Sequence, residues 1–229
     1  MIHKFIFVNP KPGMSETQFF RYWEDRHAPI AAPIPQVKGY LICPRVGLPS
    51  EKKPAAFSGW AEVWIQDEAA EMAFLERYVA GPRLDEPNFL AFWNMLALDT
   101  TTHAALAGEP LRKGSTQVRL LVLCKRRAGM PLAEFRRHLL EVHAPKVLRL
   151  PGLRRCHQCP VNDGHYAIGE APLDSVSLLW FDSVPAIVQM TESREYREQV
   201  APDLEQFTEA KFTQVMAATE HWVVGPELR

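Results

Sequence analysis

Residues 24–30 read EDRHAPI, and residues 141–147 read EVHAPKV. The two His-Ala-Pro tripeptides begin at His27 and His143, 116 positions apart. The same offset aligns further identities: Gly13-Met14 with Gly129-Met130, Phe19 with Phe135, Arg21 with Arg137, Pro35 with Pro151, Cys43-Pro44 with Cys159-Pro160 and Trp64 with Trp180. Because the series is colinear and needs no gap, it predicts two copies of one unit, each a small domain of its own.

Each copy shows the same order of predicted elements. Short apolar runs with strand character alternate with amphipathic segments that begin after Gly13 and Gly129 and again near Asp67 and Ser183. The predicted strands are residues 5–8, 40–43, 60–65 and 93–99 in the first copy and residues 120–124, 153–159, 176–181 and 213–219 in the second. The resulting order, strand-helix-strand-strand-helix-strand, is that of a ferredoxin-like domain.

The first helix of each copy leads into its histidine. Ser15 is expected to cap the first-copy helix, with Gln18 completing a capping box. Phe20, Trp23 and His27 are spaced to share one face of that helix. Because a proline disfavours helical geometry at the residue before it, each helix is predicted to end near its histidine.

The strand at residues 120–124, LLVLC, is apolar on both faces, which predicts a sheet covered on both sides. Helices of the same copy would cover one side, and the sheet of the other copy would cover the second. The predicted fold is therefore α+β: two tandem ferredoxin-like βαββαβ repeats whose antiparallel four-stranded sheets pack as a pseudo-twofold α/β barrel. The repeats are assigned to residues 1–105 and 117–229, with residues 106–116 as the linker.

The composition narrows the function classes. The chain has 229 residues, 47% hydrophobic and 23% charged, with a formal net charge of −1. No basic surplus would neutralise a phosphate backbone, so no nucleic-acid partner is expected. The apolar run at residues 5–8 is too short for a signal peptide, and no stretch approaches the roughly 18 apolar residues of a membrane span. We therefore expect no membrane contact, a cytoplasmic location and four reduced cysteines.

The first-copy segment KPGMSETQFFRYWEDRHAPIA, residues 11–31, resembles the EthD-like branch of the dimeric α/β-barrel superfamily. Members have a strand, a turn similar to Lys-Pro-Gly-Met-Ser, an aromatic-rich helix with a Trp, and His-Ala-Pro at the helix end. The matching positions are Lys11, Pro12, Gly13, Met14, Ser15, Phe19, Trp23, His27 and Pro29. The second copy, at residues 125–147, is similar but lacks the Ser and has Leu139 where the first copy has Trp23.

The resemblance implies a barrel that single-copy members complete by pairing and that this chain would complete with its own two copies. A further homodimer is left open. The resemblance also implies one of several activities. Some members are cofactor-free isomerases, cyclases or lyases acting on lactones and polyketide-type aromatics, and others are haem-dependent oxygenases or peroxidases.

His27 is the leading candidate for catalysis, because a histidine titrates near neutral pH and exchanges protons in either direction. The alternative is a structural ring that caps helix carbonyls. His143 is the matched candidate, with more aliphatic neighbours at Leu139 and Leu140. If one copy has lost its activity, we expect it to be the second.

The strand at residues 60–65 offers a second candidate. Trp60, Glu62 and Trp64 alternate onto one of its faces. A carboxylate between two tryptophans is expected to be partly desolvated, with a raised pKa suited to proton transfer. Alternatively, this face meets solvent, or Glu62 pairs with an arginine. Tyr40 and Trp93 are expected to line the same cavity, although aromatics at strand spacing are often plain core.

The run CHQC, residues 156–159, is not expected to bind a metal or act in redox chemistry. No second cysteine pair exists to complete a tetrahedral zinc site, and residues three apart in a strand point to opposite faces. His103 and His221, each just past a predicted fourth strand, form a second near-repetition to which no role is assigned.

These observations favour a cofactor-free enzyme, an isomerase or lyase, with a hydrophobic pocket between the sheet and the first helix. His27, His143 and Glu62 would move a proton during isomerisation, cyclisation, dehydration or decarboxylation. The bound molecule would be a small aromatic, lactone or polyketide-like compound, and the side chains expected to bind it are Trp23, Tyr40, Trp60, Trp64 and Trp93. Two alternatives remain open: a binding or stress-associated module without turnover, and a haem enzyme with a helix histidine as axial ligand.

Overall fold

The computed structural model describes residues 1–49, 51 and 55–227. The first repeat contains β1 (Ile2–Val8), α1 (Glu16–Tyr22), a π-helical turn (Trp23–His27), α2 (Ala28–Ala31), β2 (Gly39–Val46), β3 (Gly59–Ile65), α3 (Glu68–Ala80), α4 (Pro82–Asp85), two 3-10 turns (Glu86–Asn88 and Phe92–Asn94) and β4 (Leu96–Thr100). The second contains β6 (Val118–Cys124), α5 (Leu132–Arg137), a π-helical turn (His138–His143), α6 (Ala144–Val147), β7 (Arg155–Pro160), a 3-10 turn (Asp163–Tyr166), β8 (Ser175–Phe181), α7 (Val184–Glu192), a π-helical turn (Tyr196–Val200), α8 (Ala201–Phe207) and β9 (Gln214–Ala218). The strand and helix order of the two repeats is the predicted one.

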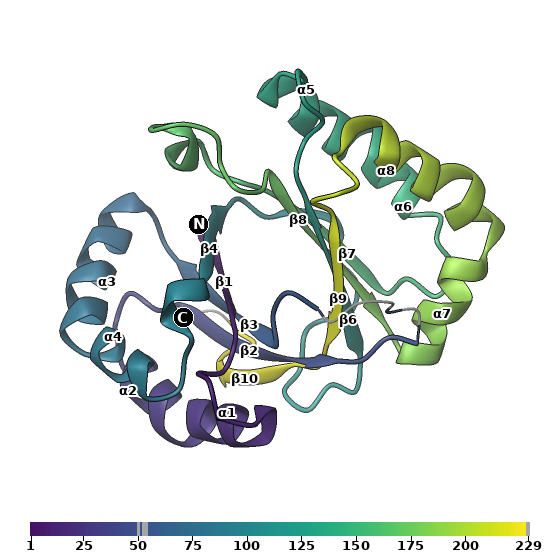
Figure 1. Ribbon diagram of the computed structural model, residues 1–229. Coiled ribbons are helices and arrows are strands. Elements are labelled where there is room, and N and C mark those ends of the chain that lie inside the picture. The colour runs from purple at the N-terminus through teal and green to yellow at the C-terminus, as the bar shows by residue number, and fades with distance from the viewer. Residues whose placement is uncertain (50, 52–54, 228–229) are drawn as a thin grey trace.

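Within the described residues, the strands form one curled antiparallel sheet of ten strands, in the order β4-β1-β3-β2-β9-β6-β8-β7-β5, with β10 (His221–Val224) paired to β2. The halves join where Arg45 of β2 pairs with Ala218 of β9. At the other side, Thr100 at the end of β4 bridges Val161 beside β7. Figure 1 shows the strands around the middle of the molecule, with the helices of each repeat on opposite outer sides. The predicted α+β tandem ferredoxin-like barrel is confirmed.

Each repeat contributes an extra strand to the other. After β4, β5 (His103–Leu106) pairs with β7 of the second repeat, and after β9, β10 pairs with β2 of the first. His103 and His221, the near-repetition seen in the sequence, are the first residues of these two exchanged strands. The exchanged strands tie the repeats together at two places: β5 forms one end of the sheet, and β10 pairs with β2 beside the junction of β2 and β9.

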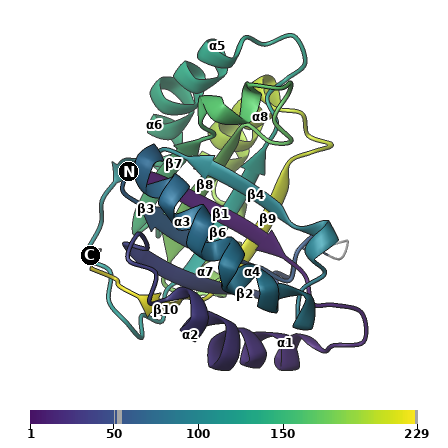
Figure 2. The same cartoon turned by 90° about the vertical axis from the view of Figure 1, so that its left-hand side faces the viewer.

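Apolar side chains pack on both faces of the sheet. The strand β6 illustrates this, since Leu121 and Leu123 lie in the core inside the barrel, whereas Leu120 lies in the core under the second-repeat helices. A matching core under the first-repeat helices contains Phe19 and Val63. In Figure 2, α3 lies across the outside of the first-repeat strands. The expectation of a sheet covered on both sides is confirmed.

The first helix begins as predicted but ends later. Ser15 accepts a hydrogen bond from the Gln18 backbone N–H, and the Gln18 side chain accepts one from Ser15, which forms the capping box. The helix was expected to end near His27, yet it continues to Ala31 through a π turn in which the Ala28 N–H donates to the Trp23 carbonyl. The wider turn leaves α-helical register just before Pro29, whose missing N–H is tolerated in the first turn of α2. No helix in the described part of the chain has the length and apolar character needed to cross a membrane.

Candidate functional site

The side chains predicted to form one pocket lie on two faces of the sheet. Trp60, Glu62 and Trp64 point into the barrel, where they join its core or contact residues across it. His27 and Tyr40 lie on the outer face of the sheet, beneath the first-repeat helices. Residues on opposite faces of a strand cannot share a cavity, so the expected pairing of His27 with Glu62 is wrong.

Trp93 lies in neither place. It belongs to a 3-10 turn, and the strand expected from residue 93 begins at Leu96. The Trp93 side chain is 66% exposed, so it does not line the cavity assigned to it. Its ring packs edge-on against Phe92 at the surface.

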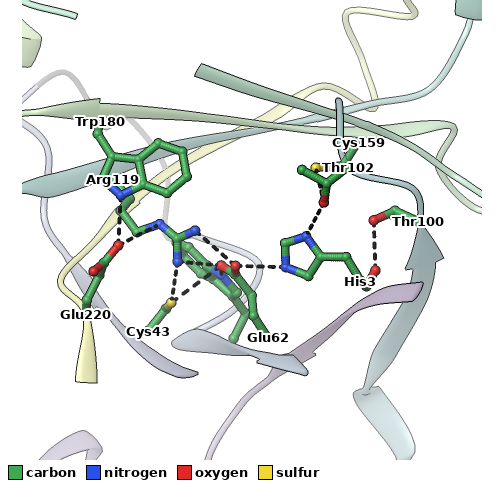
Figure 3. Close-up of polar contacts among 10 residues, drawn as sticks. His3, Cys43, Glu62, Thr100, Thr102, Arg119, Cys159, Trp180 and Glu220 are labelled. Atoms are coloured by element: carbon green, nitrogen blue, oxygen red, sulfur yellow. Dashed lines mark hydrogen bonds and ion pairs between the residues drawn. The ribbon is translucent and has the colours of Figure 1, made fainter. Parts of the chain in front are cut away.

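Glu62 is the centre of a charged cluster inside the barrel (Figure 3). The Arg119 guanidinium donates to both of its carboxylate oxygens, Nη1 to Oε1 at 2.6 Å and Nη2 to Oε2 at 2.9 Å. Trp60 Nε1 donates to Oε1 at 2.7 Å, and His3 Nε2 lies 2.9 Å from Oε2. Arg119 also pairs with Glu220 at 3.3 Å and stacks over the Trp180 ring at 4.4 Å.

This cluster corrects the expected chemistry of Glu62. Burial alone would raise its pKa, but the charge of Arg119 and the hydrogen bonds from His3 and Trp60 outweigh burial and lower that pKa to about 2. The carboxylate is therefore ionised and fully paired at neutral pH, which is the arginine-paired alternative rather than a proton donor. Glu62 and Arg119 are both buried and come from different repeats, so the cluster links the two halves of the barrel.

His143 occupies a different environment, at the end of the π turn in the second repeat. Its Nδ1 lies 2.7 Å from Asp203 Oδ2, and its ring packs on Phe207 at 5.0 Å. Asp203, on α8, also accepts from His138 and Lys146. With Nδ1 held by a carboxylate, Nε2 is the ring nitrogen left for a bound molecule.

The electrostatics of this pair favour a neutral imidazole. Burial lowers the pKa of His143 below its ordinary value, and the Asp203 carboxylate only partly offsets that shift. Burial would raise the pKa of Asp203, but hydrogen bonds from Lys146 and His143 outweigh it and hold that pKa below its usual range. A neutral histidine oriented by an ionised carboxylate is the arrangement of a general base.

The His143 ring lies on the wall of a cavity of about 190 Å³ between the second-repeat sheet and helices. Side chains from β6, β8, α7 and the π turn before α8 form most of this wall. They are predominantly aliphatic, and include Leu120, Val122, Leu179, Ile187, Met190, Tyr196 and Val200. Leu48, which follows β2 of the first repeat, also lines the cavity.

The first repeat has the same dyad but little space around it. His27 Nδ1 lies 3.1 Å from Asp85 Oδ2, and the His27 ring packs on Phe89 at 4.8 Å. Burial lowers the pKa of His27 as it does that of His143. The cavity beside His27 measures only about 40 Å³.

Two large aromatic side chains line the smaller cavity. In the first repeat Trp23 Nε1 donates to the Tyr40 hydroxyl at 2.7 Å, and both rings occupy the space between sheet and helix. Their counterparts at the repeat offset are Leu139 and Cys156, which are much smaller. We expected that, if one copy had lost its activity, it would be the second, yet the larger of the two cavities lies in the second copy.

The two aspartates were missed in the sequence. They lie in a repeated Asp-x-x-x-Phe pattern, Asp85 with Phe89 and Asp203 with Phe207, 118 positions apart. The first-repeat cavity also contains a buried carboxyl, Glu86, whose pKa burial raises to about 7 and which accepts from Tyr78 and Arg83. Glu86 has no carboxylate counterpart in the second repeat, where Leu204 stands at the offset of 118 that aligns the two aspartates.

The CHQC run lies along β7. Cys156 faces the second-repeat helices and Cys159 the inside of the barrel, as expected for residues three apart in a strand. Within the described residues, no group of three or more metal-ligating side chains is close enough to hold an ion.

A known family model matches the chain twice, once in each repeat. The EthD domain model matches residues 11–92 and again residues 127–211. A proposed monooxygenase from Fusobacterium nucleatum superposes with a TM-score of 0.65 at 6% identity, covering 100% of this chain and 94% of that one. An anthrone oxidase-like protein gives 0.61 at 12% identity, covering 99% and 94%, and a proposed chlorite dismutase gives 0.55 at 11%, covering 96% and 94%. No curated protein matches significantly. At these identities the likeness shows the fold alone.

Proposed function

The chain belongs to the EthD family, and we propose that its second repeat is a cofactor-free site that transfers a proton on a small one-ring molecule. One observation carries the proposal: His143, oriented by Asp203 at 2.7 Å, lies on the wall of an apolar cavity of about 190 Å³. The proposal assigns His143 as the general base and Asp203 as its positioning residue. Leu179, Met190 and Tyr196 would contact the bound molecule.

The cavity supports a bound molecule of one ring. A protein cavity of about 150 Å³ lined by aliphatic and aromatic side chains binds benzene, so a volume of 190 Å³ suits a ring with a short substituent. The lining is mostly aliphatic, which favours an aromatic or other apolar ring over a sugar or a nucleotide.

The proposed chemistry follows from the dyad. Asp203 accepts a hydrogen bond from Nδ1–H of the neutral His143, which leaves the Nε2 lone pair to remove a proton from the substrate. The resulting imidazolium is stabilised by the Asp203 charge, and it returns the proton at another atom. Isomerisation, cyclisation, dehydration and decarboxylation all use this transfer.

A haem fits this site poorly. His143 Nε2 could ligate iron, but ligand sites for drug-sized molecules measure about 300 to 1,000 Å³ and a porphyrin is larger than most drugs. The cavity of about 190 Å³ beside His143 is below that range. The proposed site is therefore cofactor-free.

Three finer expectations stay predictions: a small aromatic, lactone or polyketide-like molecule as the ligand, a homodimer beyond the intrachain barrel, and a cytoplasmic location. The alternative of a binding module without turnover uses the same cavity, and it differs from an enzyme only in leaving the bound molecule unchanged.

The test compares the two histidines by the same substitution. One-ring aromatic ketones and lactones are screened by thermal shift, and exchange of their acidic C–H protons in D2O is followed by NMR. We expect His143→Gln to lower the exchange rate by about 10² to 10⁴, the usual contribution of a general base, and His27→Gln to leave it unchanged. Exchange that survives His143→Gln overturns the assignment, and binding without exchange in the wild type favours the binding module.

A further inference from the structure

The apolar wall of the second-repeat cavity contains one buried polar pair, Gln158 on β7 and Ser177 on β8. The two residues are opposite one another in the sheet, and both line the cavity. Gln158 is 0% exposed, and the Ser177 hydroxyl donates to its side-chain oxygen.

The amide nitrogen of Gln158 has a weaker hydrogen-bond partner than its side-chain oxygen has. In the part of the chain that the structure describes, its acceptor is Cys156 Sγ at 3.6 Å. A thiol sulfur is a weak acceptor, so a strong N–H donor remains available at the cavity wall. Buried polar groups without good partners are uncommon in folded proteins and call for an explanation.

The first repeat serves as an internal comparison. At the positions equivalent to Gln158 and Ser177 it has Ile42 and Ala61, which also face each other across two strands. Both belong to the apolar core beneath the first-repeat helices. The fold therefore forms this wall without a polar pair, and the pair in the second repeat needs another reason.

We propose that the Gln158 amide binds a carbonyl oxygen of the substrate, which makes the substrate a one-ring ketone or lactone. This inference rests on the proposed function, because it uses the same cavity and the same base. The cavity then offers one hydrogen-bond donor at Gln158 and one base at His143 in a lining that is otherwise mostly aliphatic. That set of groups recognises a carbonyl compound with an acidic neighbouring C–H bond.

The proton transfer balances without a further reactant. His143 Nε2 takes a proton from the carbon beside the carbonyl, and the C–H electron pair forms a carbon–carbon double bond. The carbonyl π pair moves to the oxygen, which becomes an enolate oxygen held by the Gln158 N–H. The imidazolium returns its proton to the same or another carbon, and the carbonyl is restored.

The experiment compares two probes of nearly equal shape, acetophenone and α-methylstyrene, which differ in having a carbonyl oxygen or a methylene group. Wild-type protein is expected to bind acetophenone about tenfold more tightly, the effect of one good hydrogen bond. The double substitution Gln158→Ile with Ser177→Ala, which recreates the first-repeat wall, is expected to bind both probes equally. It is also expected to slow exchange of the acetophenone methyl protons in D2O by about 10² to 10³.

The outcomes separate this inference from the proposed function. Wild-type binding of both probes with equal affinity overturns the role of Gln158 but leaves the cavity and His143 in place. Binding of neither probe contradicts the proposed function itself. A preference for acetophenone that survives the double substitution also overturns the inference. Gln158→Leu alone repeats the measurement if the double variant does not fold, and thermal melting of each variant checks folding independently.

Discussion

The two His–Asp dyads show how neighbouring side chains separate two sites built on the same geometry. In each repeat a histidine at the end of a π turn meets an aspartate through Nδ1, and a phenylalanine packs on the ring. The dyads differ in what lies beside them, because Trp23 and Tyr40 line the cavity of about 40 Å³ beside His27, whereas mostly aliphatic side chains line the cavity of about 190 Å³ beside His143. The geometry of the dyad is therefore a property of the repeat, whereas the space beside it differs between the repeats.

The pH dependence of proton exchange tests the dyad. Because burial lowers the pKa of His143, its base form persists to lower pH, and exchange is expected to fall only below the ordinary histidine value of about 6.5. Asp203→Asn removes the charge that opposes burial, so it should shift this acid limb lower still. It should also slow exchange at neutral pH by about a hundredfold or more, since the ring loses its fixed tautomer. Rates from pH 4 to 8 give both values.

The matched control is Asp85→Asn in the first repeat, which should leave the exchange profile unchanged. An acid limb of the exchange rate near pH 7 or above in the wild type contradicts the assignment.

The lowered pKa of His143 also makes folding stability depend on pH. Because the folded pKa of His143 lies below its unfolded value, the unfolded chain binds more protons below about pH 6.5, and stability rises with pH across that window.

At the residue scale, the sequence predicted the histidines but not their partners. His27 and His143 follow from the repeat offset of 116, whereas Asp85 and Asp203 are 118 apart, because the second repeat has two more residues before its aspartate. A search that allowed this shift would have found the repeated Asp-x-x-x-Phe pattern. The ionised state of Glu62 was not predictable, since its partner Arg119 lies in the other repeat.

Among the elements, the π turns explain why a helix passes through a proline. The rule that a helix ends before proline assumes α-helical geometry. In both repeats a hydrogen bond between residues five apart forms a π turn that ends at the histidine of His-Ala-Pro. The Ala144 N–H donates to the Leu139 carbonyl, as Ala28 does to Trp23. The boundary prediction failed for this reason, although the helix, its capping box and its buried face were predicted.

Exchanging the paired side chains between helix and sheet in the two repeats tests whether they determine the size of the cavity. Leu139→Trp with Cys156→Tyr places the first-repeat pair in the second repeat, where the new indole N–H can donate to the new hydroxyl. We expect the cavity to close and binding of one-ring aromatics to be lost, as measured by calorimetry. The reciprocal variant, Trp23→Leu with Tyr40→Cys, should lose about 2 to 5 kcal/mol of stability to the cavity it creates.

The reciprocal variant is also the binding control. It should retain the second-repeat site and add a second equivalent of bound aromatic beside His27. Unchanged binding in Leu139→Trp with Cys156→Tyr, provided that the variant melts cooperatively, shows that these two positions do not determine the cavity.

In the whole molecule, the pseudo-twofold symmetry is broken at its centre. His3 and Arg119 are equivalent positions on β1 and β6, and both contact Glu62. Thr102 Oγ1 lies 2.8 Å from His3 Nδ1. In the second repeat, Glu220 is the counterpart of Thr102, and it pairs with Arg119, the counterpart of His3. The second repeat has Leu178 where the first has Glu62, so one carboxylate is shared by both halves. The barrel and its repeats were predictable from the sequence, but this shared charge needed the relative placement of the two sheets.

The shared carboxylate should hold the repeats in register. Arg119→Met leaves Glu62 buried without its main partner, which is expected to cost about 3 to 5 kcal/mol in urea unfolding. Glu62→Leu combined with Arg119→Met should cost less than the sum of the single variants, because the double variant contains no orphaned Glu62 charge. The pKa of Glu62, about 2, lies below its unfolded value, so its contribution is complete above about pH 4.5 and is lost as pH falls toward 2. The control is the exposed pair Arg194 and Glu198, where Arg194→Met should cost under about 1 kcal/mol. An Arg119→Met cost no larger than this control refutes a register role for the cluster.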